Sequence, residues 1–167
     1  MSSENLKWID IVSPTLTKEE YNAKFGDEET IKDNYSTYNP KSDVIQKITE
    51  ILSEKKTSLK IMAMGAAWCK DCKLQIPHLL KIVNTLPSEL VEMKILYGIK
   101  TDPYRKAGDI KWSARHSPPE AINPKFAANK IPMIYFFDAT GDLLAMIEER
   151  PRTHSTIEEV LLAALDI

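Results

Sequence analysis

A short apolar strand runs directly into a helix in the middle of the chain, and this junction constrains the fold more than any other feature. Leu59–Met64 is a mostly apolar run of strand length. From Lys70 to about Leu86, apolar residues recur at the three- and four-residue spacing of a helix. The segment Trp68-Cys69-Lys70-Asp71-Cys72 lies at the junction. A buried strand followed at once by a helix is typical of an α/β sheet.

The rest of the chain supplies further elements for such a sheet. Capping-box spacing predicts two helix starts, at Thr17 and at Ser155. Helices are predicted over about 17–25, 42–52, 70–86, 123–129 and 155–165, and strands over 59–64, 91–99, 131–137 and 143–147. This order predicts an α/β fold in which a central mixed sheet carries helices on both faces.

The cysteine pair is the strongest candidate for chemistry. A thiol at a helix start faces unpaired amides and the positive end of the helix dipole, which favour a thiolate at Cys69. Cys72 lies one turn further along, where it can close a disulfide. Two alternatives remain: a pair of inert cysteines, or half of a zinc site completed by histidines. The three histidines, however, lack the spacing of zinc ligands, so we expect no metal (His78, His116 and His154).

Several motifs, in order along the chain, resemble those of the thioredoxin family. They are the Trp-Cys-x-x-Cys segment, a helix proline five residues later, an Ile-Pro pair that opens an apolar strand, and a glycine in the hairpin turn (Trp68, Cys69, Cys72, Pro77, Ile131, Pro132 and Gly141). The resemblance covers about residues 42–167. It implies a thioredoxin-like fold in which the Ile131–Pro132 bond is cis and faces the cysteines.

The resemblance also implies an activity, that of a thiol-disulfide oxidoreductase acting on protein disulfides. Cys69 is then the nucleophile and Cys72 the resolving thiol, and no cofactor or metal is needed beyond their own redox-active disulfide. Trp68, Ile131 and Pro132 are expected to contact substrate. A recycling reductase is implied as a partner. A non-catalytic redox sensor or adaptor, binding through 1–41 or 101–122, is the alternative.

Two residues between the cysteines are expected to modulate the nucleophile. Lys70 favours the thiolate by its positive charge, and Asp71 opposes it by its negative charge. These effects oppose each other, so we expect little net change in the reactivity of Cys69 from this dipeptide.

Three departures from the family pattern bear on substrate and rate. Ala63 stands where the family often has a buried acid that accepts a proton from the resolving thiol. Arg150-Pro151-Arg152 stands where a glycine usually follows the last strand. The chain is also about twenty residues longer between Thr101 and Ile122. We expect the fold to tolerate all three.

Charge and composition limit the kinds of partner that the chain is expected to bind. The 167 residues carry 22 basic and 24 acidic side chains, a net charge of −2. Such a chain has no global attraction for nucleic acid or anionic membrane. The first ten residues lack the pattern of a secretory leader, so we expect a cytoplasmic protein. We further expect a monomer with a single domain over 1–167, whose core spans 42–167 and whose extension spans 1–41.

The insertion at 101–122 lies in the one strongly basic part of the chain. Residues 100–130 hold seven basic and three acidic side chains. Because parallel strands end at the same sheet edge, this segment is expected to border the cysteines. We therefore expect it to recognise an acidic partner, with Tyr104 and Trp112 as apolar anchors (Lys100, Arg105, Lys106, Lys111 and Arg115 supply the charge).

Overall fold

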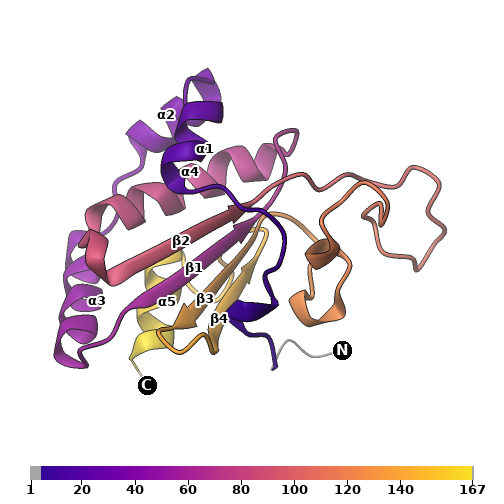
Figure 1. Ribbon diagram of the computed structural model, residues 1–167. Helices are drawn as coiled ribbons and strands as arrows, with labels where there is room; N and C mark the ends of the chain where they lie inside the picture. Colours follow the sequence, from indigo (N-terminus) through magenta and orange to yellow (C-terminus); the bar gives the residue numbers. More distant parts are fainter. Residues whose placement is uncertain (1–4, 167) are drawn as a thin grey trace.

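Four strands form one mixed sheet in the computed structural model, which describes residues 5–166 (Figure 1). The strand order is β2-β1-β3-β4, in which β1 and β2 are parallel and the other pairs antiparallel. The strands are β1 (Leu59–Met64), β2 (Val91–Leu96), β3 (Met133–Asp138) and β4 (Leu143–Glu148). This is the mixed sheet that the sequence predicts.

Five α-helices accompany the sheet: α1 (Lys18–Phe25), α2 (Glu29–Thr37), α3 (Ser42–Glu54), α4 (Lys70–Thr85) and α5 (Ile157–Leu165). The predicted capping box of α1 is present, because Thr17 and Glu20 exchange side chain-to-amide hydrogen bonds. Thr156, not Ser155, caps α5. No helix within residues 5–166 is long and apolar enough to cross a membrane.

Helical segments cover both faces of the sheet, as predicted, but they differ in kind. The helix α5 contacts both α3 and α4 on one face (Figure 1). Two single turns of 3-10 helix cover the other, η1 (Trp8–Asp10) and η4 (Pro124–Phe126). Trp8 packs edge-on against Phe137, and Phe126 packs edge-on against Tyr135. The helix predicted over 123–129 is therefore only the short turn η4.

The N-terminal extension is bound to the rest of the fold at several points. Leu16 pairs with Ile95 at the outer edge of β2 through two backbone hydrogen bonds of 2.8 and 2.9 Å. The buried Glu120 accepts hydrogen bonds from the amides of Val12 and Ser13 and from the Ser13 hydroxyl, at 2.6–2.8 Å. The segment before α1 is thus part of the packed structure.

The carboxyl ends of β1 and β2 meet at one edge of the sheet, and this edge positions the cysteines. The two strands run in register from Leu59 opposite Val91 to Met64 opposite Leu96. β2 ends three residues before the predicted limit, because Gly98 adopts a positive φ of 108° that an extended strand does not allow. The loop after β1 then leads directly into α4.

Candidate active site

Cys69 occupies the N-cap position of α4. Its backbone is extended, and its Sγ accepts a hydrogen bond from the amide of Cys72 at 3.3 Å. The first amides of the helix have no carbonyl partners within it, so a thiolate here is stabilised by them and by the helix dipole. The Cys69 side chain is 7% exposed and lines an open cleft. Cys69 is therefore the cysteine that borders the cleft.

Cys72 lies one helical turn further on and is fully buried. Gly65 makes room for it, since a Cβ atom at position 65 would lie 2.7 Å from the Cys72 Sγ. The same Cβ would lie 3.1 Å from the ring of Tyr97, so this tyrosine closes the site from the β2 side. Neither Gly65 nor Tyr97 was singled out from the sequence. Cys72 is thus closed off from solvent, whereas Cys69, although also buried, lines the cleft.

The pKa values of the two thiols move in opposite directions. The hydrogen bond from the Cys72 thiol is the main cause that lowers the pKa of Cys69 to about 7, and the amides of Cys72 and Asp71 lower it further. Burial and the Asp71 carboxylate oppose this, in line with the expected effect of Asp71. The same hydrogen bond, followed by burial, raises the pKa of Cys72 far above its usual value. At neutral pH, Cys69 is therefore partly thiolate and Cys72 a thiol.

The loop before β3 faces the cysteines. The Ile131–Pro132 bond is cis, as predicted, and the Ile131 carbonyl oxygen lies 3.9 Å from the Cys69 Sγ. Ile131 and Trp68 line the same cleft as Cys69, which has a volume of about 340 Å³. Trp68 is half exposed and donates its Nε1–H to the carbonyl of Ile99 at 2.9 Å. The structure thus brings the expected substrate-contact residues together, with Pro132 buried beside them.

Glu149 contributes a carboxylate to the cleft from the end of β4. Its amide donates to the Pro132 carbonyl at 2.7 Å, and its side chain pairs with Arg152 at 3.0 Å. Its φ is +67°, a left-handed conformation that costs a residue with a side chain roughly 1–2 kcal/mol. Glu149 is the residue directly after β4, and the stretch Arg150–Arg152 that the sequence singled out follows it.

The insertion also reaches the cleft, although not as expected. Thr101, Lys111 and Trp112 all line it. Trp112 is only 4% exposed and donates its Nε1–H to the Ala128 carbonyl at 2.5 Å. The prediction that Trp112 anchors a partner is therefore wrong, because its indole holds the insertion to the loop before Pro132. Tyr104, by contrast, is 90% exposed.

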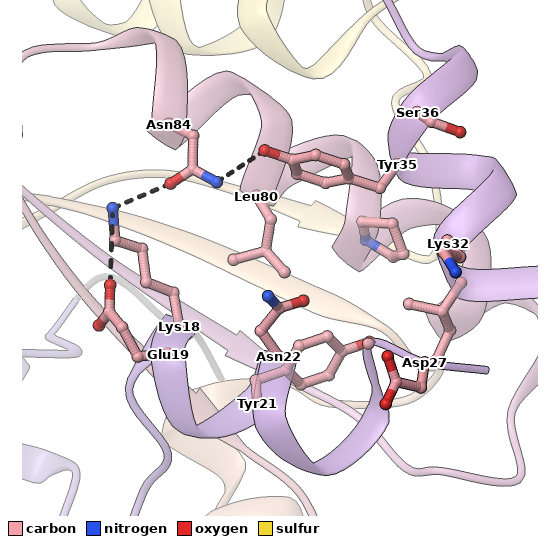
Figure 2. A pocket seen from close by; sticks show the side chains of 13 residues that line it. Lys18, Glu19, Tyr21, Asn22, Asp27, Lys32, Tyr35, Ser36, Leu80 and Asn84 are labelled. Carbon is pink, nitrogen blue, oxygen red and sulfur yellow. Dashed lines mark hydrogen bonds and ion pairs between the residues drawn. The ribbon is translucent and has the colours of Figure 1, made fainter.

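The part of the chain that the structure describes has no cluster of metal ligands, but it does have a second cavity. Across residues 5–166, no three His, Cys, Asp or Glu side chains gather where they could hold a metal ion. A separate cavity of about 400 Å³ lies between α1, α2 and α4, with Tyr21 and Leu80 in its lining (Figure 2). Its polar side chains include Lys18, Asn84 and Tyr35, joined by hydrogen bonds of 2.9 Å. Neither cysteine lines this cavity, so it is distinct from the Cys69 cleft.

Fold and site together define a thioredoxin-like protein, in which a cysteine caps the helix after a central strand and faces a cis-proline. A family model described as thioredoxin matches residues 16–98, which include both cysteines. The chain is thus thioredoxin-like in its fold and similar to the thioredoxin family over these residues.

Solved structures agree with this fold. A protein of unknown function from Pseudomonas aeruginosa matches with a TM-score of 0.65 and 13% identity, over 96% of this chain and 97% of the other. An HIV epitope-scaffold matches with a TM-score of 0.57 and 13% identity, over 96% and 93%. At such low identity, the likeness concerns the fold alone. No curated protein sequence matches significantly.

Proposed function

We propose that the protein is a thiol-disulfide oxidoreductase that reduces protein disulfides through a dithiol-disulfide cycle of Cys69 and Cys72. One observation carries this proposal, the asymmetry of the two thiols. Cys69 opens onto a cleft and has a pKa lowered to about 7, whereas Cys72 is buried and has a raised pKa. An attacking thiol works best when its pKa lies near the ambient pH.

The cycle moves two electrons from the dithiol to the substrate. The Cys69 thiolate attacks one sulfur of the substrate disulfide, which forms a mixed disulfide and expels the other substrate sulfur as a thiolate that takes up a proton. Cys72 then loses its proton to solvent and attacks the Cys69 Sγ. This forms the Cys69–Cys72 disulfide and releases the second substrate thiolate, which is protonated in turn. A dithiol reductant must then reduce the Cys69–Cys72 bridge.

The surroundings of Cys69 are suited to an extended substrate. The backbone at Ile131 and Pro132 offers an edge along which a polypeptide can align, as an added strand does. Trp68 supplies a half-exposed apolar wall to the same cleft. Lys70 adds a positive charge beside the nucleophile. In the cell we propose disulfide-bearing proteins as substrates, a separate reductase that recycles the bridge, a cytoplasmic location and a monomeric state.

The absence of a carboxylate at position 63 favours a second candidate, a redox sensor or adaptor. Ala63 is fully buried on β1, where the family often has an acid that takes the proton of the resolving thiol. In the mixed disulfide Cys69 is no longer a thiolate, but burial still raises the pKa of Cys72, so attack by Cys72 on the mixed disulfide is slowed. A long-lived mixed disulfide suits a protein that holds a partner more than one that turns it over.

Multiple-turnover reduction of a protein disulfide separates the two candidates. Insulin is incubated with excess dithiothreitol and catalytic amounts of the protein, and release of its B chain is followed by turbidity. The oxidoreductase proposal predicts many turnovers per protein, and a return to the background rate of dithiothreitol in Cys69→Ser and in Cys72→Ser. A wild-type rate equal to that background refutes catalysis and leaves the sensor.

A further inference from the structure

We propose, on the basis of that function, that the cleft beside Cys69 selects disulfides flanked by acidic residues. Three lysines from separate segments line it together with the nucleophile: Lys70 at the start of α4, Lys111 in the insertion and Lys130 just before the cis-proline loop. All three are exposed. The cleft therefore presents positive charge around the one sulfur that a substrate must reach.

The negative charges of the cleft do not cancel these lysines. Its two carboxylates are those of Asp71 and Glu149. The Glu149 carboxylate is already paired with Arg152, at 3.0 Å. Within residues 5–166, no carboxylate lies within 4 Å of the ammonium group of Lys70, Lys111 or Lys130 (the ion pairs of this part of the chain involve other residues). A bound segment can thus pair with them without breaking an existing ion pair.

The backbone of the insertion holds Lys111 at the cleft. Thr101 and Trp112 form a bridge between the two arms of the insertion, and the Asp102 amide donates to the Lys111 carbonyl at 2.8 Å. The next residue, Trp112, is buried and donates its indole N–H to the Ala128 carbonyl. Lys111 therefore differs from a solvated charge on a free loop, because the hydrogen bond to its own carbonyl and the burial of Trp112 fix the position of its backbone.

Most of the other basic residues of the insertion lie away from the cleft. The insertion projects from the carboxyl end of β2 as a long excursion (Figure 1). Arg105 and Lys106 lie exposed between two turns of this excursion and do not line the cleft. Of the basic residues that the sequence predicts to recognise an acidic partner, only Lys111 lines the cleft. Lys70 and Lys130 line it from outside the insertion. Arg105 and Lys106 provide a matched control of equal charge.

The chemistry favours an acidic polypeptide over a nucleic acid. The proposed reaction requires a disulfide, which a polypeptide carries and a nucleic acid does not. Nucleic-acid binding depends on the neutralisation of many phosphates, and the chain as a whole has a net charge of −2. Three lysines around one cleft suit a few carboxylates next to a cysteine. Exposed ion pairs of this kind each contribute a modest factor, so the expected effect is selectivity and not tight binding.

The test compares two disulfide-linked peptides that differ only in Glu or Gln at the residues flanking each cysteine. The wild-type protein is expected to reduce the Glu peptide with a kcat/KM about fivefold higher at low salt. The ratio should approach one in about 1 M salt, where the screening length falls to about 3 Å. Lys111→Gln/Lys130→Gln should lose the preference, and Arg105→Gln/Lys106→Gln should keep it.

Each remaining outcome has a definite meaning. Equal rates for both peptides with the wild-type protein would overturn the inference while leaving the oxidoreductase in place. Loss of the preference in the Arg105/Lys106 control would overturn the assignment to the cleft. Inhibition by a short RNA but not by a Glu-rich peptide would reassign the lysines to nucleic acid. Reduction of neither peptide refutes the proposed function itself, and with it this inference.

Discussion

Removal of the Cys72 thiol is expected to raise the pKa of Cys69. The hydrogen bond from this thiol is the largest of the causes that lower the pKa of Cys69 to about 7. In Cys72→Ala the amides of residues 71 and 72 remain, so the lowering is lost only in part, and we expect a rise of about one unit. At pH 7 the thiolate fraction of Cys69 then falls from about one half to about one tenth.

The assay is the pH profile of thiolate absorbance at 240 nm, or of alkylation by iodoacetamide, in the reduced protein. The midpoint is the readout, because the nucleophilicity of a thiolate rises with its pKa and partly offsets the smaller thiolate fraction. Cys72→Ser is the matched control, since its hydroxyl can still donate to the Cys69 sulfur and should keep the midpoint closer to wild type. An unchanged or lower midpoint in Cys72→Ala would refute this explanation of the Cys69 pKa.

Three further outcomes are expected. The pKa of Cys69 in the folded protein lies below its unfolded value of about 8.5, so its thiolate stabilises the reduced fold above pH 8.5. In urea unfolding, we expect about 2 kcal/mol of this free energy of unfolding, measured relative to Cys69→Ser, to be lost as the pH falls through 7. Ala63→Asp should speed the release of substrate from the mixed disulfide in stopped-flow chase experiments, at a cost in stability. Glu149→Gly should raise the free energy of unfolding by about 1 kcal/mol or less, since relief of the left-handed strain exceeds the loss of the exposed pair with Arg152.

Each of these can fail in a specific way. A stability difference between wild type and Cys69→Ser that does not change between pH 6 and 9 contradicts the lowered Cys69 pKa. Unchanged release in a folded Ala63→Asp protein shows that proton transfer from Cys72 is not limiting. A lower free energy of unfolding in Glu149→Gly means that the Glu149 side chain contributes more than the strain costs.

The parts of the fold that were predictable are those that depend on local sequence. β1 is a mostly apolar run, and α1 has its cap and its capping acid within four residues. At the active-site junction an apolar strand run is followed by apolar residues at helical spacing, so Cys69 and Cys72 could be placed at the start of a helix. The limit of β2 was missed because one glycine backbone conformation, at Gly98, ends the strand. Strand propensity averaged over several residues does not reveal the backbone conformation of one glycine.

Other features depend on residues far apart in the sequence. The helix α2 buries only Ile31 and has no side-chain cap, and it forms against α4. Glu120 holds Ser13 across 107 positions of the chain. An aromatic residue in a basic segment predicts an exposed anchor, whereas tertiary packing buries Trp112. These contacts follow only from the assembled fold.

The most direct test of the central claim is to trap the mixed disulfide. The reduced Cys72→Ser protein is mixed with a disulfide-bonded polypeptide, quenched with acid and analysed by intact-mass and peptide mass spectrometry. We predict a covalent adduct of one substrate chain, linked through Cys69, which dithiothreitol removes, and no adduct with Cys69→Ser. An adduct through Cys72 in the Cys69→Ser protein, or none in Cys72→Ser at any substrate concentration, would contradict the assignment of Cys69 as nucleophile.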